Sequence, residues 1–333
     1  MFGDNTMKKA LLPLAIATVM PMSAFAVGPI DGALYGKISV SVDSVDDGTN
    51  STTEVNSNAS RIGVKGKSEL SKGLYAIYKA EFEIYVDDGD SGKTSDGHDE
   101  FEQRNIYVGL TGSAGTVIVG RHDTPAKLAQ KKIDVFGDLT GDIKHTFEGE
   151  NRVSNMVMYT SPKMNGLSAS LMAIAAEGDD VDNDGTNDDG FDSMSYSVSY
   201  SVDNLYVALA GDQDVDNQDL MRLVAQYKMG DLKLGAMYQA NEDNTDGTSK
   251  DESGYFVSAA YKLGNGFTVK GQYGAVEDDA DQDEEDTLSL GVDYKLAKKT
   301  KLFAYYTTNG DTTGSTNVEV EDDVFGIGME HKF

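Results

Sequence analysis

Cysteine and tryptophan are absent from this 333-residue chain, and proline occurs only five times. Without cysteine no disulfide framework can form, so burial and backbone pairing must stabilise the fold. Beyond residue 26 the only prolines are Pro29, Pro125 and Pro162. Because proline lacks the N–H that strand pairing needs, the long proline-free stretches are compatible with extended β-strands.

Long apolar runs are also missing. No stretch offers the roughly 20 apolar residues that a spanning helix requires, and the mean hydropathy is −0.40. A shorter apolar stretch, residues 10–22, follows the basic Met7-Lys8-Lys9 and leads to the small-x-small sequence Ala24-Phe25-Ala26. This order is typical of a secretory signal peptide. We predict a signal peptide over residues 1–26, with residues 1–6 as an over-extended start, and one domain over residues 27–333.

Basic residues are scarce: 28 Lys and Arg stand against 56 Asp and Glu, for a formal net charge of −28 at pH 7. A nucleic-acid partner is disfavoured, because binding to phosphates needs a basic face. Much of the excess lies in blocks such as 177–191 and 277–286, which contain no basic residue. Such blocks are typical of solvated loops.

What the chain does have is alternation of apolar and polar side chains. Met194, Tyr196 and Val198, for example, are separated by serines. A period of two places one set of side chains on each face of a strand, and no segment shows a sustained helical period. We therefore predict an all-β fold with sixteen strands, near residues 32–43, 58–68, 73–86, 101–110, 115–121, 152–161, 167–176, 191–201, 204–210, 219–229, 231–240, 253–263, 266–276, 286–296, 299–308 and 323–333.

The predicted connections alternate between seven short turns and eight long polar segments. A membrane barrel has tight turns at one end and long loops at the other, whereas a soluble β-sandwich has no reason to sort its loops in this way. The pattern predicts a transmembrane antiparallel β-barrel. The long segments lie near residues 44–57, 87–100, 122–151, 177–190, 211–218, 241–252, 277–285 and 309–322.

Aromatic residues gather close to the short turns. We expect them to form a girdle where the bilayer meets water, because their rings are amphipathic. Five tyrosines end even-numbered strands, and two phenylalanines begin the strands that follow; these are Tyr159, Tyr200, Tyr227, Tyr261, Tyr294, Phe267 and Phe303.

Several motifs, in order over the whole mature chain, resemble the general trimeric diffusion porins of Gram-negative outer membranes. They are Leu34-Tyr35-Gly36-Lys37 at the start of the first strand, residues 60–66 (SRIGVKG), 104–110 (RNIYVGL), 115–121, 151–162, and the terminal Phe333. The resemblance implies a single porin β-barrel over residues 27–333 in the outer membrane. It also implies a homotrimer that contacts membrane lipid and lipopolysaccharide, passes ions and small hydrophilic solutes, and has no cofactor or catalytic chemistry.

The resemblance further implies that the third long connection folds into the lumen and narrows it. Carried over to this sequence, the basic side of the constriction would be Arg61, Arg104 and Arg152, and the acidic side Asp134 and Asp138. Opposed charges across a narrow passage create a strong transverse field. Phe333 would be the signal for barrel assembly.

Alternation supports an inward orientation for two of the three arginine side chains. Arg61 and Arg152 fall opposite their apolar neighbours and so point inward, whereas Arg104 shares its face with Ile106 and Val108. On strict alternation Arg104 would point outward.

Two rival readings of the function remain: a substrate-selective channel on the same barrel, and a secreted acidic β-sandwich that binds calcium or carbohydrate. Residues 180–185 match the opening of a calcium loop, but Phe191 stands where the loop needs its bidentate glutamate. The four histidines carry no catalytic signature, so we expect no enzyme and no metal site. The acidic loops predict a weak cation preference, because they concentrate cations at the mouth.

Overall fold

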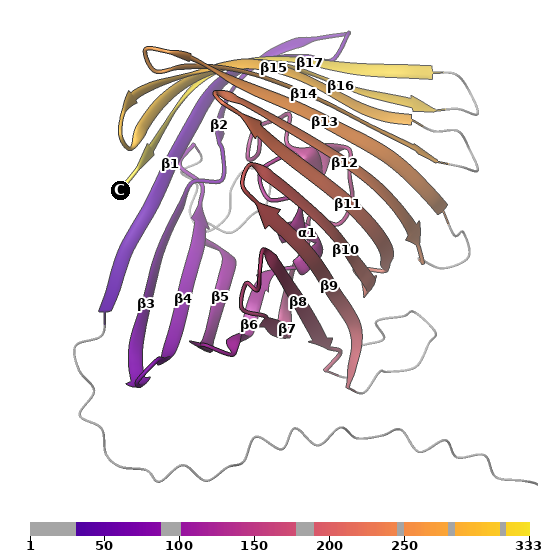
Figure 1. Ribbon diagram of the computed structural model, residues 1–333. Helices are drawn as coiled ribbons and strands as arrows, with labels where there is room; N and C mark the ends of the chain where they lie inside the picture. The colour runs from indigo at the N-terminus through magenta and orange to yellow at the C-terminus, as the bar shows by residue number, and fades with distance from the viewer. Residues whose placement is uncertain (1–30, 88–100, 178–189, 245–249, 279–283, 314–317) are drawn as a thin grey trace, which may run out of the picture.

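The computed structural model describes residues 31–87, 101–177, 190–244, 250–278, 284–313 and 318–333 (Figure 1). Residues 1–30, and with them the predicted signal peptide, lie outside the described part, as does the calcium-loop match at 180–185. The elements are β1(Asp31–Asp46), β2(Ser51–Ser57), β3(Arg61–Ser71), β4(Leu74–Ile84), β5(Phe101–Gly112), β6(Gly115–Asp123), α1(Pro125–Ala129), η1(Ile143–His145), β7(Arg152–Thr160), β8(Leu167–Ala175), β9(Phe191–Val202), β10(Leu205–Val215), β11(Gln218–Met229), β12(Leu232–Asp243), β13(Lys250–Gly264), β14(Phe267–Asp278), β15(Glu284–Ala297), β16(Thr300–Thr313) and β17(Val318–Lys332).

The strands form one antiparallel sheet that closes on itself. Each strand from β3 to β17 pairs with the next along the chain, and β17 pairs with β1 through ten residue pairs, from Lys37↔Lys332 to Asp46↔Asp323. Closure leaves no free sheet edge, so every wall strand has hydrogen-bonding partners on both sides. The β-sandwich alternative is therefore wrong.

The barrel has sixteen strands, although β2 and β3 are separate segments. Both pair with β1, β2 opposite residues 40–46 and β3 opposite residues 31–37. They are one wall strand, interrupted where Ala59 adopts a left-handed conformation with φ of 47°. The predicted sixteen-stranded antiparallel barrel is confirmed.

Side chains alternate between the two faces of the wall. In β12, Leu234 and Tyr238 are exposed on the outside of the barrel. Met237 and Gln239, the two residues that flank Tyr238, are buried on the inside. The outward face carries the apolar residues and the inward face most of the polar ones, which is the reverse of a soluble protein and suits a barrel in lipid.

Exposed aromatic rings lie in two outward bands. Tyr159, Tyr227, Tyr261 and Phe267 form the predicted band near the short turns. A second band, which was not predicted from the sequence, includes the cross-strand pairs Tyr238↔Tyr255 and Tyr306↔Phe325. On β13 the two bands are six residues apart, roughly 20 Å along the strand, and the outward, exposed Val257 lies between them.

One aromatic assignment is wrong. Phe303 is 3% exposed and packs inside the barrel with Tyr305. Its neighbour Leu302, which is 39% exposed, occupies the outward position. The distance of a residue from a turn fixes its depth in the membrane. Whether its side chain points outward or inward depends instead on its odd or even position along the strand.

Two predicted long connections are also wrong. Residues 211–218 contain the end of β10 and the start of β11, joined by a two-residue turn at Asp216 and Asn217, both with φ of 58°. Positive φ at both positions suits a tight hairpin turn. Residues 44–57 likewise form a hairpin between β1 and β2. Most side chains on both faces of these strand ends are polar, so their sequences show no clear alternation.

The third connection, residues 124–151, contains the two helical elements of the described chain. Thr124 caps α1 by accepting a hydrogen bond from the Lys127 N–H, and Pro125 stands at the first helical position. Asp142 caps η1 in the same way. Figure 1 shows α1 in the space that the strands surround. Within the described residues no helix is long and apolar enough to cross a membrane.

Candidate pore constriction

Apolar residues of the third connection pack against glycines on the inward face of the wall. A Cβ atom at Gly235 would lie 2.8 Å from the Cβ of Ile133, and one at Gly291 would lie 2.8 Å from Phe136. Phe147 similarly covers Gly254 and Gly274. Ile133, Phe136 and Phe147 are each at most 2% exposed. The missing side chains on β12 to β15 leave the room that these three residues fill.

Polar side chains of the same strands hydrogen-bond to the backbone of the connection. Lys270 donates to the carbonyl of Val135 at 2.9 Å, and Gln272 donates to the carbonyl of Gly141 at 2.6 Å while accepting from the Val135 N–H at 2.9 Å. Ser258 donates to the carbonyl of Ile133. The middle of the connection, from residue 133 to residue 141, is thus held to β13 and β14.

Arg222 on β11 joins the two ends of the connection. Its guanidinium is 0% exposed and donates to the carbonyls of Ala126 at 3.3 Å and Glu148 at 2.9 Å. It also forms an ion pair with Glu150 at 2.8 Å and donates to Gln239 at 2.8 Å. A buried arginine is stable only when its charge and donors are satisfied, and here the connection itself supplies most of the partners.

Asp138 contacts two cations of the wall directly. Its Oδ2 lies 2.6 Å from both Lys37 Nζ on β1 and Arg61 Nη2 on β3. Burial raises the pKa of the Asp138 carboxyl, but Lys37 and Arg61 outweigh burial and hold it below its usual value. The predicted pair Arg61 and Asp138 is therefore brought together, as an ion pair in contact rather than as charges facing each other across an open gap.

Arg104 points inward because β5 contains a bulge. The register runs from Ala80↔Ile106 to Phe82↔Gln103, so two residues of β5 oppose Glu81 alone. The extra residue reverses the alternation. Arg104 then pairs with Glu83 and lies 3.4 Å from Glu81. The outward placement that strict alternation gave is wrong.

Arg152 also has a carboxylate partner. Its Nε lies 2.9 Å from Asp123 on β6 and 3.1 Å from the side-chain oxygen of Asn105. Lys127 approaches the same Asp123 at 3.8 Å. All three predicted arginines are thus inward and each is paired with an acid, although only Arg61 pairs with the third connection.

Asp134 lies within the connection and shapes it. Its carboxylate accepts the Phe136 N–H at 2.8 Å and the Ile143 N–H at 3.2 Å. Burial raises the pKa of Asp134 above the usual carboxyl range, and the charge of Asp142 adds to this effect. Among the described residues Asp134 forms no ion pair within 4.0 Å.

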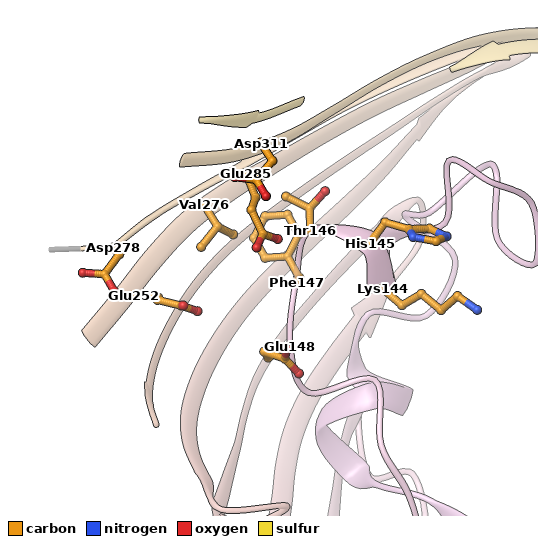
Figure 2. A pocket seen from close by; sticks show the side chains of 10 residues that line it. All are labelled: Lys144, His145, Thr146, Phe147, Glu148, Glu252, Val276, Asp278, Glu285 and Asp311. Carbon is orange, nitrogen blue, oxygen red and sulfur yellow. The ribbon is translucent and has the colours of Figure 1, made fainter. Parts of the chain in front are cut away.

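An acidic pocket of about 230 Å³ lies where the connection meets the ends of β13 to β16 (Figure 2). Lys144 and His145 are its only basic lining residues, and burial, followed by the charge of Lys144, lowers the pKa of His145. In the described part of the chain no group of three His, Cys, Asp or Glu side chains is arranged to hold a metal ion. The carboxylates that line the pocket are Glu148, Glu252, Asp278, Glu285 and Asp311.

Phe333 lies at the seam of the barrel. Its N–H donates to the Gly36 carbonyl at 3.1 Å, and the Gly36 N–H donates back at 3.3 Å. A Cβ atom at Gly36 would lie 2.2 Å from the tip of the Phe333 ring. The terminal residue therefore helps to pair the first strand with the last.

The roles of Arg222, Lys37 and the inward glycines were not predicted from the sequence. Parity alone could have placed Lys37 and Arg222 inside, and glycines within predicted strands mark places where another segment approaches closely. No sequence signal, however, pairs those glycines with particular residues of the connection.

A closed barrel with an apolar outer face and a polar inner face defines a β-barrel membrane channel. A sequence model of the Gram-negative porin family matches residues 14–314, so the chain belongs to that family. It is an outer-membrane channel protein, and members of the family serve diffusion rather than catalysis.

Relatives resemble the chain over nearly its whole length. The major outer membrane protein P.IB of Neisseria meningitidis serogroup A is 26% identical over 359 residues, which cover 98% of this chain and 100% of that protein. Outer membrane porin protein 32 of Delftia acidovorans is 25% identical, covering 89% of this chain and 88% of that protein.

Solved structures show the same fold. An anion-selective porin from Comamonas acidovorans superposes with a TM-score of 0.75 at 22% identity, over 91% of this chain and 100% of that one. OmpF of Salmonella typhi, in complex with daunomycin, gives a TM-score of 0.70 at 17% identity, over 91% of this chain and 97% of that one.

Proposed function

We propose that the chain forms a water-filled pore for passive diffusion of ions and small hydrophilic solutes, narrowed by the third connection. The observation that carries this proposal is the set of contacts from residues 124–151 to inward side chains of β10 to β16 and, through Asp138, to Lys37 and Arg61. The passage then lies between the connection and strands β4 to β7, where Arg104 and Arg152 face inward.

We also propose a weak preference for cations. The acidic pocket and the strand ends around it place carboxylates at the end of the long connections, where they raise the local cation concentration. The preference is weak for two reasons. The constriction arginines are already paired with acids, and lysines such as Lys228 and Lys233 line the opposite end of the barrel.

The test is the reversal potential of the purified protein in a planar bilayer under a potassium chloride gradient. Stepwise, ohmic channels with a small cation-preferring potential are the expected result. Silent membranes would contradict the pore, and an anion-preferring potential would contradict the selectivity alone.

Assembly as a homotrimer and contact with lipopolysaccharide are part of the proposal. OmpT of Vibrio cholerae, 18% identical with a TM-score of 0.66, has been described in a trimer form. Its likeness supports the fold, and the trimer is inferred for this chain by analogy. Mass measurement in detergent after subtraction of the bound detergent checks it: a monomer mass would contradict the trimer.

We further propose that residues 1–26 are removed on export, which N-terminal sequencing of the outer-membrane protein would test.

A further inference from the structure

Two lysines face each other at the turn end of the barrel interior. Lys228 on β11 and Lys233 on β12 are direct cross-strand partners. Lys228 has the parity of buried Arg222 and Gln226, and Lys233 has that of buried Met237, so both side chains point inward. Like charges placed directly opposite each other in a sheet are destabilising.

The third connection brings two more lysines to the same place. The carbonyl of Lys132 accepts a hydrogen bond from Lys233 Nζ. Lys131 Nζ lies 4.1 Å from the centre of the Tyr206 ring, near the start of β10. Burial lowers the pKa of Lys131, and the charges of Lys228 and Lys163 lower it further.

These charges lack acidic partners in the described chain. No carboxylate there lies within 4.0 Å of the amino groups of Lys131, Lys132, Lys228 or Lys233, whereas Lys37, Lys270 and Lys301 all have one. The carboxylate oxygens of Asp134 in the connection accept backbone N–H groups instead.

We propose that Lys131, Lys132, Lys228 and Lys233 form a binding site for a multivalent oxyanion of the phosphate class inside the turn end of the lumen. Lysine binds such anions as a point charge and favours no planar group, and several converging ammonium groups favour a ligand with more than one negative charge. The anion would supply the compensating charge that the protein does not. The site lies within the proposed pore, but binding can be measured without conduction.

The test uses the full-length, detergent-solubilised protein and sodium pyrophosphate, titrated by calorimetry against a background of potassium chloride. The wild type should bind, and K228Q/K233Q should weaken binding by about tenfold, or about 1.4 kcal/mol. K131Q/K132Q, which leaves the wall unchanged, should weaken it similarly. K65Q/K67Q removes the same charge from inward positions on β3, where the lysines lie over Tyr35 and Tyr75, and should bind as the wild type does.

Equal binding by the wild type and both cluster variants would overturn the proposal, as would equal weakening by K65Q/K67Q, which would mean that only net charge matters. Each variant is first shown to fold by its faster migration on an unheated gel. Open-channel conductance in potassium chloride without pyrophosphate reports the pore separately, so loss of the pore and absence of the anion site give different results.

Discussion

At the scale of single residues, the charged side chains of the proposed constriction form short ion pairs. Asp138 forms ion pairs with both Lys37 and Arg61, and Arg104 and Arg152 have partners on neighbouring strands. Charges in contact produce a weaker field across the passage than separated charges do. Selectivity should therefore respond most to the removal of an acid that leaves cations unpaired.

Asp138→Asn should shift the reversal potential toward anions, because it leaves Lys37 and Arg61 without a carboxylate. We expect the ratio of cation to anion permeability to fall by about twofold, equivalent to about 0.4 kcal/mol. Asp134→Asn is the matched control, since the Asp134 carboxylate accepts backbone N–H groups and forms no ion pair with the wall in the described chain. An equal shift of the reversal potential in both variants would contradict the different roles assigned to Asp138 and Asp134.

The pKa of Asp134 is raised in the fold, by burial first and by the charge of Asp142 second. A raised carboxyl pKa favours the protonated form, so the connection should lose stability as the pH rises from the ordinary carboxyl pKa of about 4 through the raised value. Hydrogen exchange at the amides of residues 133–143, corrected for intrinsic rates, should show protection falling over this window. Asp134→Asn should abolish the dependence; an unchanged slope in that variant would contradict the assignment.

At the scale of elements, bulky side chains of the connection pack where the inward face of the wall has glycines. Ile133, Phe136 and Phe147 occupy the space above inward glycines of β12 to β15. These glycine positions tolerate little added side-chain volume, because a close-packed interface leaves no empty space for it. The position of the connection is therefore set by the wall as much as by its own sequence.

Gly274→Ala should loosen the connection, since its Cβ would lie 2.8 Å from Phe147 and 3.0 Å from Phe256. Overpacking of this kind typically costs about 1–3 kcal/mol. We expect larger current fluctuations in single-channel recordings. Gly271→Ala, three residues away on the outward face and 3.1 Å from the flexible Leu290 side chain, should leave the recordings unchanged. Unchanged current fluctuations in both variants would show that the position of Phe147 does not depend on the absence of a side chain at Gly274.

At the scale of the whole molecule, the barrel is closed by pairing between its first and last strands. Ten residue pairs join β1 to β17, and Phe333 extends the seam through two hydrogen bonds with Gly36. The charge is also arranged along the axis, with the acidic pocket at the end of the long connections and the lysine cluster at the turn end.

Deletion of Phe333 removes both of its hydrogen bonds with Gly36 and the ring that covers this glycine. We expect the fraction of heat-modifiable, folded protein in the outer membrane to fall severalfold. Phe333→Tyr keeps the backbone pairing and an aromatic ring, and should behave as the wild type. An unchanged amount of folded protein in the outer membrane after the deletion would show that barrel assembly does not require Phe333.

The alternating sequence by itself determined the strand count, the antiparallel barrel and the inward face of Arg61, because each of these follows from a period of two repeated along the chain. It does not place Arg152, because the register of β7 shifts between Val153 and Met156. It also located the third connection, through its length and its departure from alternation. Where both faces of a strand are polar, as at residues 211–218, periodicity carried no information and the prediction failed.

Only the tertiary structure decided the inward face of Arg104, the partners of each arginine and the role of Asp134. A single bulge opposite Glu81 reverses the parity of β5, and no local pattern marks it. The ion pair of Asp138 with Arg61 joins residues 77 positions apart, and the lysine cluster joins β11 and β12 to a segment about 100 residues earlier. Contacts at such separations depend on how the closed wall folds the chain back on itself, which no short stretch of sequence specifies.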